Sequence, residues 1–357
     1  MQTISLKELL PLADQPNILK ALIVAHRHLA ELKGIAKTIP NQAILLSTLS
    51  LQEAQDSSAI ENIITTQDAL FKYRLQTDIK DVVAKEVSNY ADGLAVGYEE
   101  VKQRGLLTLN TILAIQETLE NNRAGFRKVP GTTLRNDKTG QIVYEPPSPE
   151  KLPLLMSELE NLIHDDTINI DPLIKMAVIH HQFESIHPFY DGNGRTGRII
   201  NILFLVKEGL LDSPILYLSR YINHTKLDYY RLLQQVRDTG IWDEWIIYLI
   251  RGIGLTAKHT IVLVEGISGL LQQQKHFIRD HYRFYSQDLI NNIFRHPYTK
   301  VQFLEHDLNI SRPTATRYLD LLAESGVLEK HKLGRENYYL NRGLVDLLFN
   351  IPRIDID

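Results

Sequence analysis

The segment 187–198, HPFYDGNGRTGR, gathers side chains that could carry out acid–base and phosphate chemistry. His187 is a base able to take a proton near neutral pH. Asp191 offers one carboxylate, which suits Mg²⁺ because this ion keeps several waters and takes other ligands from substrate phosphates. Arg195 and Arg198 lie three residues apart, so one helical face presents two guanidinium groups to phosphate oxygens. The sequence therefore predicts a loop for nucleotide chemistry with Mg²⁺.

A glycine-rich stretch in this loop comes just before a helix predicted from Arg195 to Glu208. Free N–H groups at a helix start, next to glycines that let a ligand approach the backbone, form an anion site suited to phosphates. A glycine turn with some surface charge is the alternative, and it explains any one of these residues but not all of them in this order. The candidate nucleotide-binding residues of the loop are Gly192, Asn193, Gly194, Arg195, Thr196, Gly197 and Arg198.

Helical patterns surround the loop. A helix is predicted over residues 18–32, with one face formed by Leu19, Leu22, Ile23 and Leu29. A second helix is predicted to start at residues 56–57, where short polar side chains could cap it.

The helix that leads into the loop is predicted to begin at Pro172, with Asp171 as its cap. It should end near Ile186, because Pro188 disfavours a helical conformation at His187.

Two segments have a different pattern. Residues 125–149 contain four prolines and two short β-prone runs, 132–134 and 142–144, around the turn 136–140, which predicts a β-hairpin or flap. Near the C-terminus, helices are predicted over 287–294, over 301–308 and from a cap at Ser311 to about 326. Two strands around Gly334 follow within 327–340. This order is typical of a winged helix-turn-helix.

Composition is ordinary for a soluble globular protein of 357 residues, with 44% hydrophobic and 23% charged residues. The net charge of −4 predicts no general attraction to nucleic acid or anionic lipid. No cysteine is present, which excludes disulfides and thiolate metal sites. We found no signal-peptide pattern, and the apolar run 199–206 is too short to span a bilayer. We therefore expect a cytoplasmic protein that does not enter a membrane.

The loop resembles the signature of the Fic family, HPFx(D/E)GNGRxxR, and the preceding run AVIHHQFESIHPF is also typical of that family. The resemblance implies a protein adenylyltransferase that transfers AMP from Mg·ATP to a Ser, Thr or Tyr hydroxyl of a protein, which could be the enzyme itself. It implies that His187 is the catalytic base, Asp191 the Mg²⁺ ligand and Asn193 an α-phosphate ligand. Arg195 and Arg198 would bind the β- and γ-phosphates. Doc-type relatives that transfer phosphate have lysine at the position of Gly194.

The segment SSAIEN, residues 57–62, matches the inhibitory pattern (S/T)xxxE(G/N) of the same family. On a helix, Ser57 and Glu61 would share a face. By this resemblance, Glu61 would pair with Arg198 and keep it from the γ-phosphate. A capping serine followed by an ordinary surface glutamate is the alternative.

The resemblance covers most of the chain. Residues 10–73 resemble the N-terminal domain of many Fic proteins, and the flap 127–147 resembles the hairpin that binds the target segment. We expect a mainly α protein: an N-terminal helical domain (1–105), a Fic core with a β-hairpin flap (106–265) and a winged-helix domain (266–357). Tyr230 and Gln234 fall where the family has a helix beside the adenine, although tyrosines at such spacing are more often core.

Three further features are less specific. His180 and His181 are better explained as packed side chains than as metal ligands, and both tryptophans as core. The segment 280–342 has nine basic and eight acidic residues, so the winged helix could dock a protein or form a homodimer as readily as bind DNA. The rival function is a DNA-binding regulator that uses the Fic pocket as a nucleotide sensor.

Overall fold

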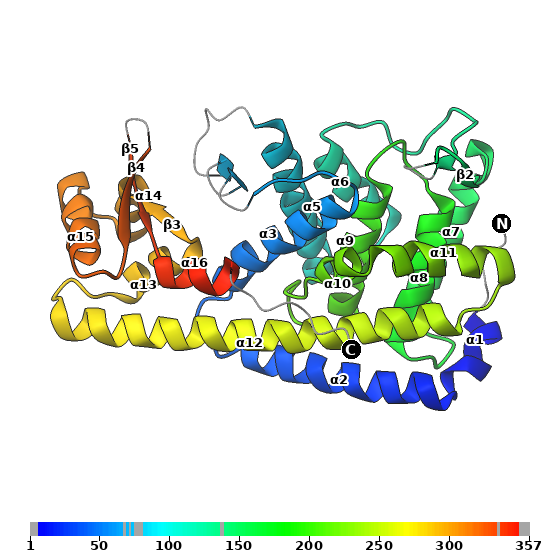
Figure 1. The fold of residues 1–357 in the computed structure, drawn as a ribbon, viewed down its shortest axis with the longest axis horizontal. Coiled ribbons are helices and arrows are strands. Elements are labelled where there is room, and N and C mark those ends of the chain that lie inside the picture. The colour runs from blue at the N-terminus through cyan, green and yellow to red at the C-terminus, as the bar shows by residue number, and fades with distance from the viewer. Residues whose placement is uncertain are drawn as a thin grey trace. The chain divides into compact units, whose positions relative to one another are not determined.

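The structure is a computed structural model that describes residues 6–66, 69–70, 73–74, 81–135, 139–333 and 336–349. The described chain is mainly helical, with small antiparallel sheets (Figure 1). It divides into two compact units, the first within residues 1–30 and 50–258 and the second within 31–49 and 259–357.

Most elements of the first unit are helices that surround α8 and α9. In chain order the elements are α1 (Leu6–Ala13), α2 (Pro16–Ala36), α3 (Ala43–Ile60), α5 (Val82–Arg104), α6 (Leu109–Glu120), β1 (Leu134–Arg135), β2 (Ile142–Tyr144), the 3₁₀ turn η1 (Pro149–Lys151), α7 (Leu152–His164), α8 (Pro172–Ile186), α9 (Asn193–Lys207), α10 (Ser219–His224), α11 (Lys226–Thr239) and α12 (Asp243–His281). Of these, α2, α3 and α12 continue into the second unit.

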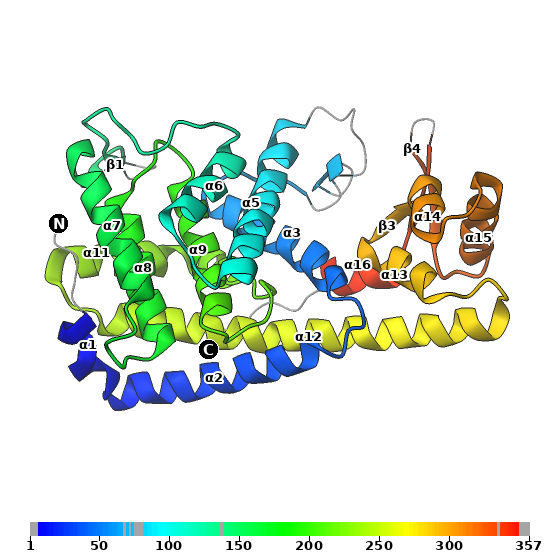
Figure 2. The same cartoon turned by 180° about the vertical axis from the view of Figure 1, so that it is seen from behind.

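The two helices on either side of the loop are almost completely buried. All residues of α8 from Leu173 to Ile186 are buried, as are most residues of α9. Helices α5 and α6 pack against α9 (Figure 2). A Cβ at Gly97 of α5 would lie only 2.4 Å from Leu203 of α9, so glycine permits this close approach. The loop is therefore supported by a densely packed core.

Helix α8 has the predicted bounds. The Asp171 side chain accepts a hydrogen bond from the N–H of Leu173 at 2.8 Å, which caps the helix. At the other end, His187 has a φ of 49°, in the left-handed region, and this ends the helix. Both sequence signals are confirmed.

Two helix predictions were wrong in detail. Of the expected face of α2, Leu22 and Leu29 are buried as predicted, whereas Leu19 and Ile23 are 43% and 70% exposed. Helix α2 also continues through Gly34. The buried stripe consists of Ile18, Leu22, Ala25, Leu29 and Leu32, and small Ala25 lies against the backbone of α12 at Gly254.

The second error concerns α3. Residues 56–57 do not start a helix but lie near its end, because α3 already begins at Ala43. The polar groups are used in tertiary contacts: Asp56 accepts a hydrogen bond from Asn223, and Ser57 accepts one from Arg198.

The predicted hairpin is present as an antiparallel pair of short strands. Leu134 pairs with Tyr144, and Arg135 with Ile142, with an irregularity in register between them. Part of the predicted turn, residues 136–138, lies outside the described residues.

Among its described residues, the second unit contains the predicted helices and the two predicted strands, together with one further strand and one further helix. Its elements are α13 (Gln287–Arg295), β3 (Tyr298–Lys300), α14 (Val301–Leu308), α15 (Arg312–Glu324), β4 (Glu329–Leu333), β5 (Glu336–Leu340) and α16 (Arg342–Phe349). The strand order is β3-β5-β4. The sequence did not predict β3 or α16, and the predicted turn at Gly334 lies outside the described residues. The winged-helix assignment stays a prediction.

Helix α12 is much longer than the run 199–206. By length and composition alone, an 18-residue window of α12 could cross a membrane. Within the protein, however, 67% of that window is buried, as in the core helix of a soluble protein.

Candidate functional site

The loop between α8 and α9 is held in shape by one asparagine side chain. The Asn193 Oδ1 accepts from the N–H of Phe189 at 2.8 Å, and its Nδ2 donates to the Phe189 carbonyl at 2.9 Å. The Phe189 ring is fully buried, 5.7 Å from the ring of Phe126. The asparagine side chain predicted as a phosphate ligand is thus used to brace the loop, while the backbone at this position starts α9.

His187 lies at the end of α8 with its imidazole largely enclosed. Burial lowers the pKa of His187 to about 4, and the charges of Arg237 and Arg127 act in the same direction. Its Nδ1 is buried. The His187 carbonyl accepts from Arg127 Nε at 2.9 Å, which fixes the backbone. At neutral pH the ring is therefore uncharged and able to accept a proton.

The first turn of α9 offers backbone N–H groups to an anion. The cap residue is Gly192, with a φ of 74° and no side chain to occupy these donors. A Cβ at Gly192 would lie 2.4 Å from Glu120 Oε1, and a Cβ at Gly194 would lie 2.4 Å from Glu61 Oε1. Glycine at both positions therefore lets carboxylates, or ligand oxygens in their place, come close to the helix start.

Asp191 is the most accessible charged group of the loop, with its side chain 75% exposed. Its Oδ1 accepts from the N–H of Gly192 and lies 3.8 Å from Arg195 Nη2. Among the described residues, no group of three or more potential ligands could hold a metal ion. A Mg²⁺ ion at Asp191 would therefore take its other ligands from phosphates and water. Mg²⁺ is commonly bound in this way, by one or two carboxylates together with substrate phosphates and several waters.

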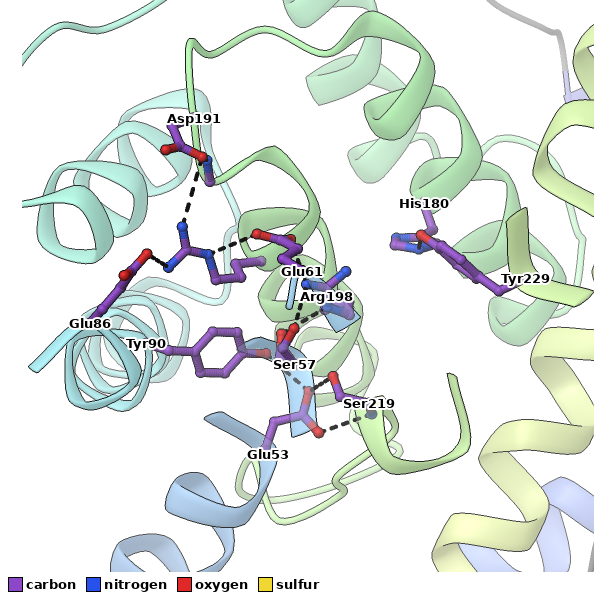
Figure 3. A network of polar contacts seen from close by, with 12 residues as sticks. Glu53, Ser57, Glu61, Glu86, Tyr90, His180, Asp191, Arg198, Ser219 and Tyr229 are labelled. Atoms are coloured by element: carbon purple, nitrogen blue, oxygen red, sulfur yellow. Dashed lines mark hydrogen bonds and ion pairs between the residues drawn. The ribbon is translucent and has the colours of Figure 1, made fainter. Parts of the chain in front are cut away.

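Arg198 is buried and held by the end of α3. Its Nε donates to Ser57 Oγ at 2.7 Å, and its Nη2 donates to the Ser57 carbonyl at 2.9 Å and to Glu61 Oε1 at 2.7 Å. Figure 3 shows Ser57 and Glu61 beside Arg198. The structure thus brings together the three residues that the sequence singled out at a separation of more than 130 residues.

Arg195 is also fully enclosed, with 1% of its side chain exposed. Its Nε donates to Glu61 Oε2 at 3.0 Å. Its Nη1 donates to Glu86 Oε1 at 2.8 Å, and its Nη2 to Glu120 Oε1 at 3.0 Å. The Glu61 carboxylate therefore bridges both arginines, with one oxygen on each. We call the three residues Glu61, Arg195 and Arg198 the arginine clamp.

Three family models match the chain in order. They are the Fic/DOC family N-terminal model over residues 19–99, the Fic/DOC family model over 106–205, and the C-terminal domain model of SoFic-like protein adenylyltransferases over 270–350. The chain belongs to the Fic family. Relatives include a probable protein adenylyltransferase of Aquifex aeolicus, 39% identical over 186 residues, which are 50% of this chain and 54% of that protein. A protein adenylyltransferase of Caenorhabditis elegans is 25% identical over 164 residues, 45% of this chain and 30% of that protein. The matched part of the chain thus spans about half, or less, of these relatives.

Solved structures show the same Fic fold. A Fic family protein from Desulfovibrio desulfuricans superposes with a TM-score of 0.57 at 20% identity, covering 91% of this chain and 96% of that one. A Fic-domain-containing signalling protein from Bacteroides thetaiotaomicron gives a TM-score of 0.53 at 18% identity, covering 68% of this chain and 98% of that one.

Helix α11 of this Fic protein carries the two residues suggested for adenine. Tyr230 is 45% exposed, and Gln234 donates from Nε2 to Asp238 at 2.7 Å. The neighbouring Tyr229 is buried, and its hydroxyl lies 2.9 Å from His180 Nε2. Of the two tyrosines, only Tyr230 has an exposed ring.

His180 and His181 are packed among aromatic rings. His180 stacks on Trp245, and His181 lies edge-on to Trp242, with ring centroids 5.9 and 4.8 Å apart. Burial lowers the pKa of each histidine to about 3. Both tryptophans are buried, as the sequence predicted.

Sequence reasoning missed two carboxylates of the Fic site, Glu86 on α5 and Glu120 on α6. Burial raises the pKa of Glu120 to about 7 even though Arg195 opposes the shift. Neither residue belongs to a local motif. In the sequence, each is an acidic residue on an amphipathic helix, and such a residue usually lies on the solvated surface. The sequence therefore offers no reason to place them in the site.

Proposed function

We propose that this Fic protein transfers AMP from Mg·ATP to a hydroxyl group of a protein, and that Glu61 inhibits the transfer. The names of its relatives support the reaction. The observation that carries the proposal is that Glu61 holds Arg195 and Arg198 in the first turns of α9, and that the loop before α9 begins with an uncharged His187. A base, an anion-binding helix start and buried cations are the parts that an attack on a phosphate requires.

In the proposed reaction, His187 takes the proton of the acceptor hydroxyl as its oxygen attacks the α-phosphorus. A new P–O bond forms, and the bond from the α-phosphorus to the bridging oxygen of the β-phosphate breaks. Pyrophosphate leaves with the electron pair. The N–H groups at the start of α9 would hold the non-bridging oxygens of the phosphate and stabilise the charge that develops there. Asp191 would hold Mg²⁺, which neutralises phosphate charge when bound.

The clamp explains how transfer would be inhibited. As long as the Glu61 carboxylate occupies Arg195 Nε and Arg198 Nη2, these donors cannot bind the terminal phosphates. Carboxylate and phosphate oxygens are interchangeable partners of a guanidinium group. Inhibition therefore requires only that Glu61 competes with ATP for the same donors.

Other parts of the proposal concern the acceptor and the nucleotide base. The acceptor is a Ser, Thr or Tyr hydroxyl of another protein or of this chain. Tyr230 would stack on adenine, because its ring is exposed and it lies on α11, where the family resemblance places a helix beside the adenine. The hairpin β1–β2 would add the target segment as a further strand. The division at residues 105 and 265 stays a prediction.

The test is covalent labelling. The protein with Glu61 replaced by glycine is incubated with Mg²⁺ and ATP labelled on the α-phosphate, together with a protein lysate. Label that survives denaturation and is lost with the additional change His187→Ala supports the transfer. Nucleotide binding without covalent label would reject it in favour of a nucleotide sensor, and DNA binding that depends on ATP would then favour the regulator.

A further inference from the structure

A second buried carboxylate lies behind the arginine clamp. Glu53 is 1% exposed and lies on α3, two helical turns before Glu61. Its Oε1 accepts from the Tyr90 hydroxyl at 3.0 Å and from the Ser219 hydroxyl, and its Oε2 accepts from the N–H of Ser219 at 3.0 Å. These contacts join α3 to α5 and to the start of α10 (Figure 3).

The Ser57 and Tyr90 side chains lie between this carboxylate and Arg198 (Figure 3). Arg198 Nε donates to Ser57 Oγ, and the Tyr90 hydroxyl donates to Glu53. Two side chains of α3 are therefore tied to other helices, Ser57 to α9 and Glu53 to α5 and α10.

The spacing on α3 makes these contacts relevant to inhibition. Glu53 and Ser57 are four residues apart, one helical turn, and Glu61 follows directly after the last turn of the helix. The segment that carries Glu61 is therefore fixed at two points: by Ser57 on Arg198 and by Glu53 on Tyr90 and Ser219. Burial raises the pKa of Glu53 to about 7, and the three donors oppose that shift.

We propose that Glu53 is a positioning residue of the inhibitory segment: through its contacts with Tyr90 and Ser219 it holds α3 in place, so that Ser57 stays on Arg198 and Glu61 stays in the arginine clamp. This inference rests on the proposed function, because it assigns a role within the inhibition by Glu61. It predicts that weakening the Glu53 contacts activates the enzyme. A merely structural carboxylate would lower activity or leave it unchanged.

Two conservative substitutions test the inference in the full-length protein. In Glu53→Gln, the amide NH₂ group must face either the N–H of Ser219 or the hydroxyls that now donate to Oε1, so at least one bond is lost or reversed. Tyr90→Phe removes the hydroxyl that donates to Glu53 and keeps the ring. Tyr98→Phe is the matched control, because Tyr98 lies on the same helix and its hydroxyl donates to the Asp212 carbonyl instead.

The measurement is the rate of covalent labelling from α-labelled ATP, with and without the additional change Glu61→Gly. We expect Glu53→Gln and Tyr90→Phe each to raise the rate roughly 2- to 10-fold, the range that follows from losing one hydrogen bond. In the Glu61→Gly protein the same changes should have no further effect, since the residue that they position is gone. Tyr98→Phe should leave both rates unchanged.

Two results would overturn the inference. One is an unchanged or lower rate for both Glu53→Gln and Tyr90→Phe when the proteins melt like the parent. The other is an equal increase with and without Glu61. If Glu53→Gln does not fold, Tyr90→Phe decides by itself. Absence of label in every variant, including Glu61→Gly, would instead reject the proposed function, so the two failures are distinguishable.

Discussion

Replacing Glu61 with glycine is expected to raise the rate of AMP transfer by about two orders of magnitude. The Glu61 carboxylate makes two charge-assisted hydrogen bonds, to Arg195 Nε at 3.0 Å and to Arg198 Nη2 at 2.7 Å. Each such bond contributes about 1.5–3 kcal/mol. Because the Glu61 side chain is 23% exposed, solvent screening favours the lower end, about 3 kcal/mol for both bonds. At about 1.4 kcal/mol for each factor of ten, this corresponds to roughly 100-fold.

An intermediate variant makes the estimate sharper. Glu61→Gln keeps the length of the side chain and one acceptor but removes the charge, so it should increase labelling by roughly tenfold. The rate of labelling should rise in the order wild type, Glu61→Gln, Glu61→Gly, through a lower KM for ATP or a higher kcat. Glu117→Gln is the matched control, because Glu117 pairs with Arg123 on the exposed surface of α6.

The same change should make the folded protein less stable. Arg198 is 3% exposed and would keep its hydrogen bonds to Ser57. Arg195 would keep Glu86 and Glu120. We expect the free energy of unfolding to fall by about 1–3 kcal/mol, and Mg·ATP to restore part of it. Labelling of Glu61→Gly at the wild-type rate, with intact folding, would refute the clamp as an inhibitory device.

Further predictions concern the base, the metal and the core. His187→Ala should abolish labelling while ATP binding, measured by calorimetry, persists, and retained labelling would assign the base elsewhere. Because the pKa of His187 is lowered to about 4, its base form is lost only as the pH falls toward that value. The kcat/KM of Glu61→Gly should therefore show no histidine inflection near pH 6.5, and such an inflection would contradict the buried geometry. Chelation of Mg²⁺ should stop transfer, and Asp191→Ala should shift the Mg²⁺ dependence to higher concentration; an unchanged dependence would remove Asp191 as the ligand. Gly97→Ala should destabilise the protein by about 1–3 kcal/mol in urea unfolding, because its Cβ would meet Leu203 and Ile115 at 2.4 and 2.8 Å. Equal urea midpoints would show that these side chains move aside freely.

The loop was predictable because its structure is determined locally. The cap at Asp171, the proline after His187 and the glycines before α9 act within a few residues of themselves, and the structure follows them. The hairpin and the helices α13–α15 were predictable for the same reason, since short turn signals separate them.

The surroundings of Arg195 were not predictable from such signals. Glu86 and Glu120 come from two separate helices, and only the packing of α5 and α6 on α9 brings them to the guanidinium group. The start of α3 was predicted wrongly because Asp56 and Ser57 look like capping residues. In the fold their side chains bind distant partners, Asn223 and Arg198, so tertiary contacts replaced the local role.

The order of the clamp residues along the chain has a consequence for how the protein is made. Glu61 precedes Arg195 by 134 residues. At roughly 5–20 residues per second, a ribosome would synthesise the inhibitory segment roughly 7–27 seconds before the arginine that it binds. Each new molecule would therefore complete its catalytic loop with the inhibitor already present. Because Glu61 and Arg195 belong to one polypeptide, their ratio would not change as the cell grows and divides. By the proposed inhibition, a newly synthesised molecule would therefore be inactive at first.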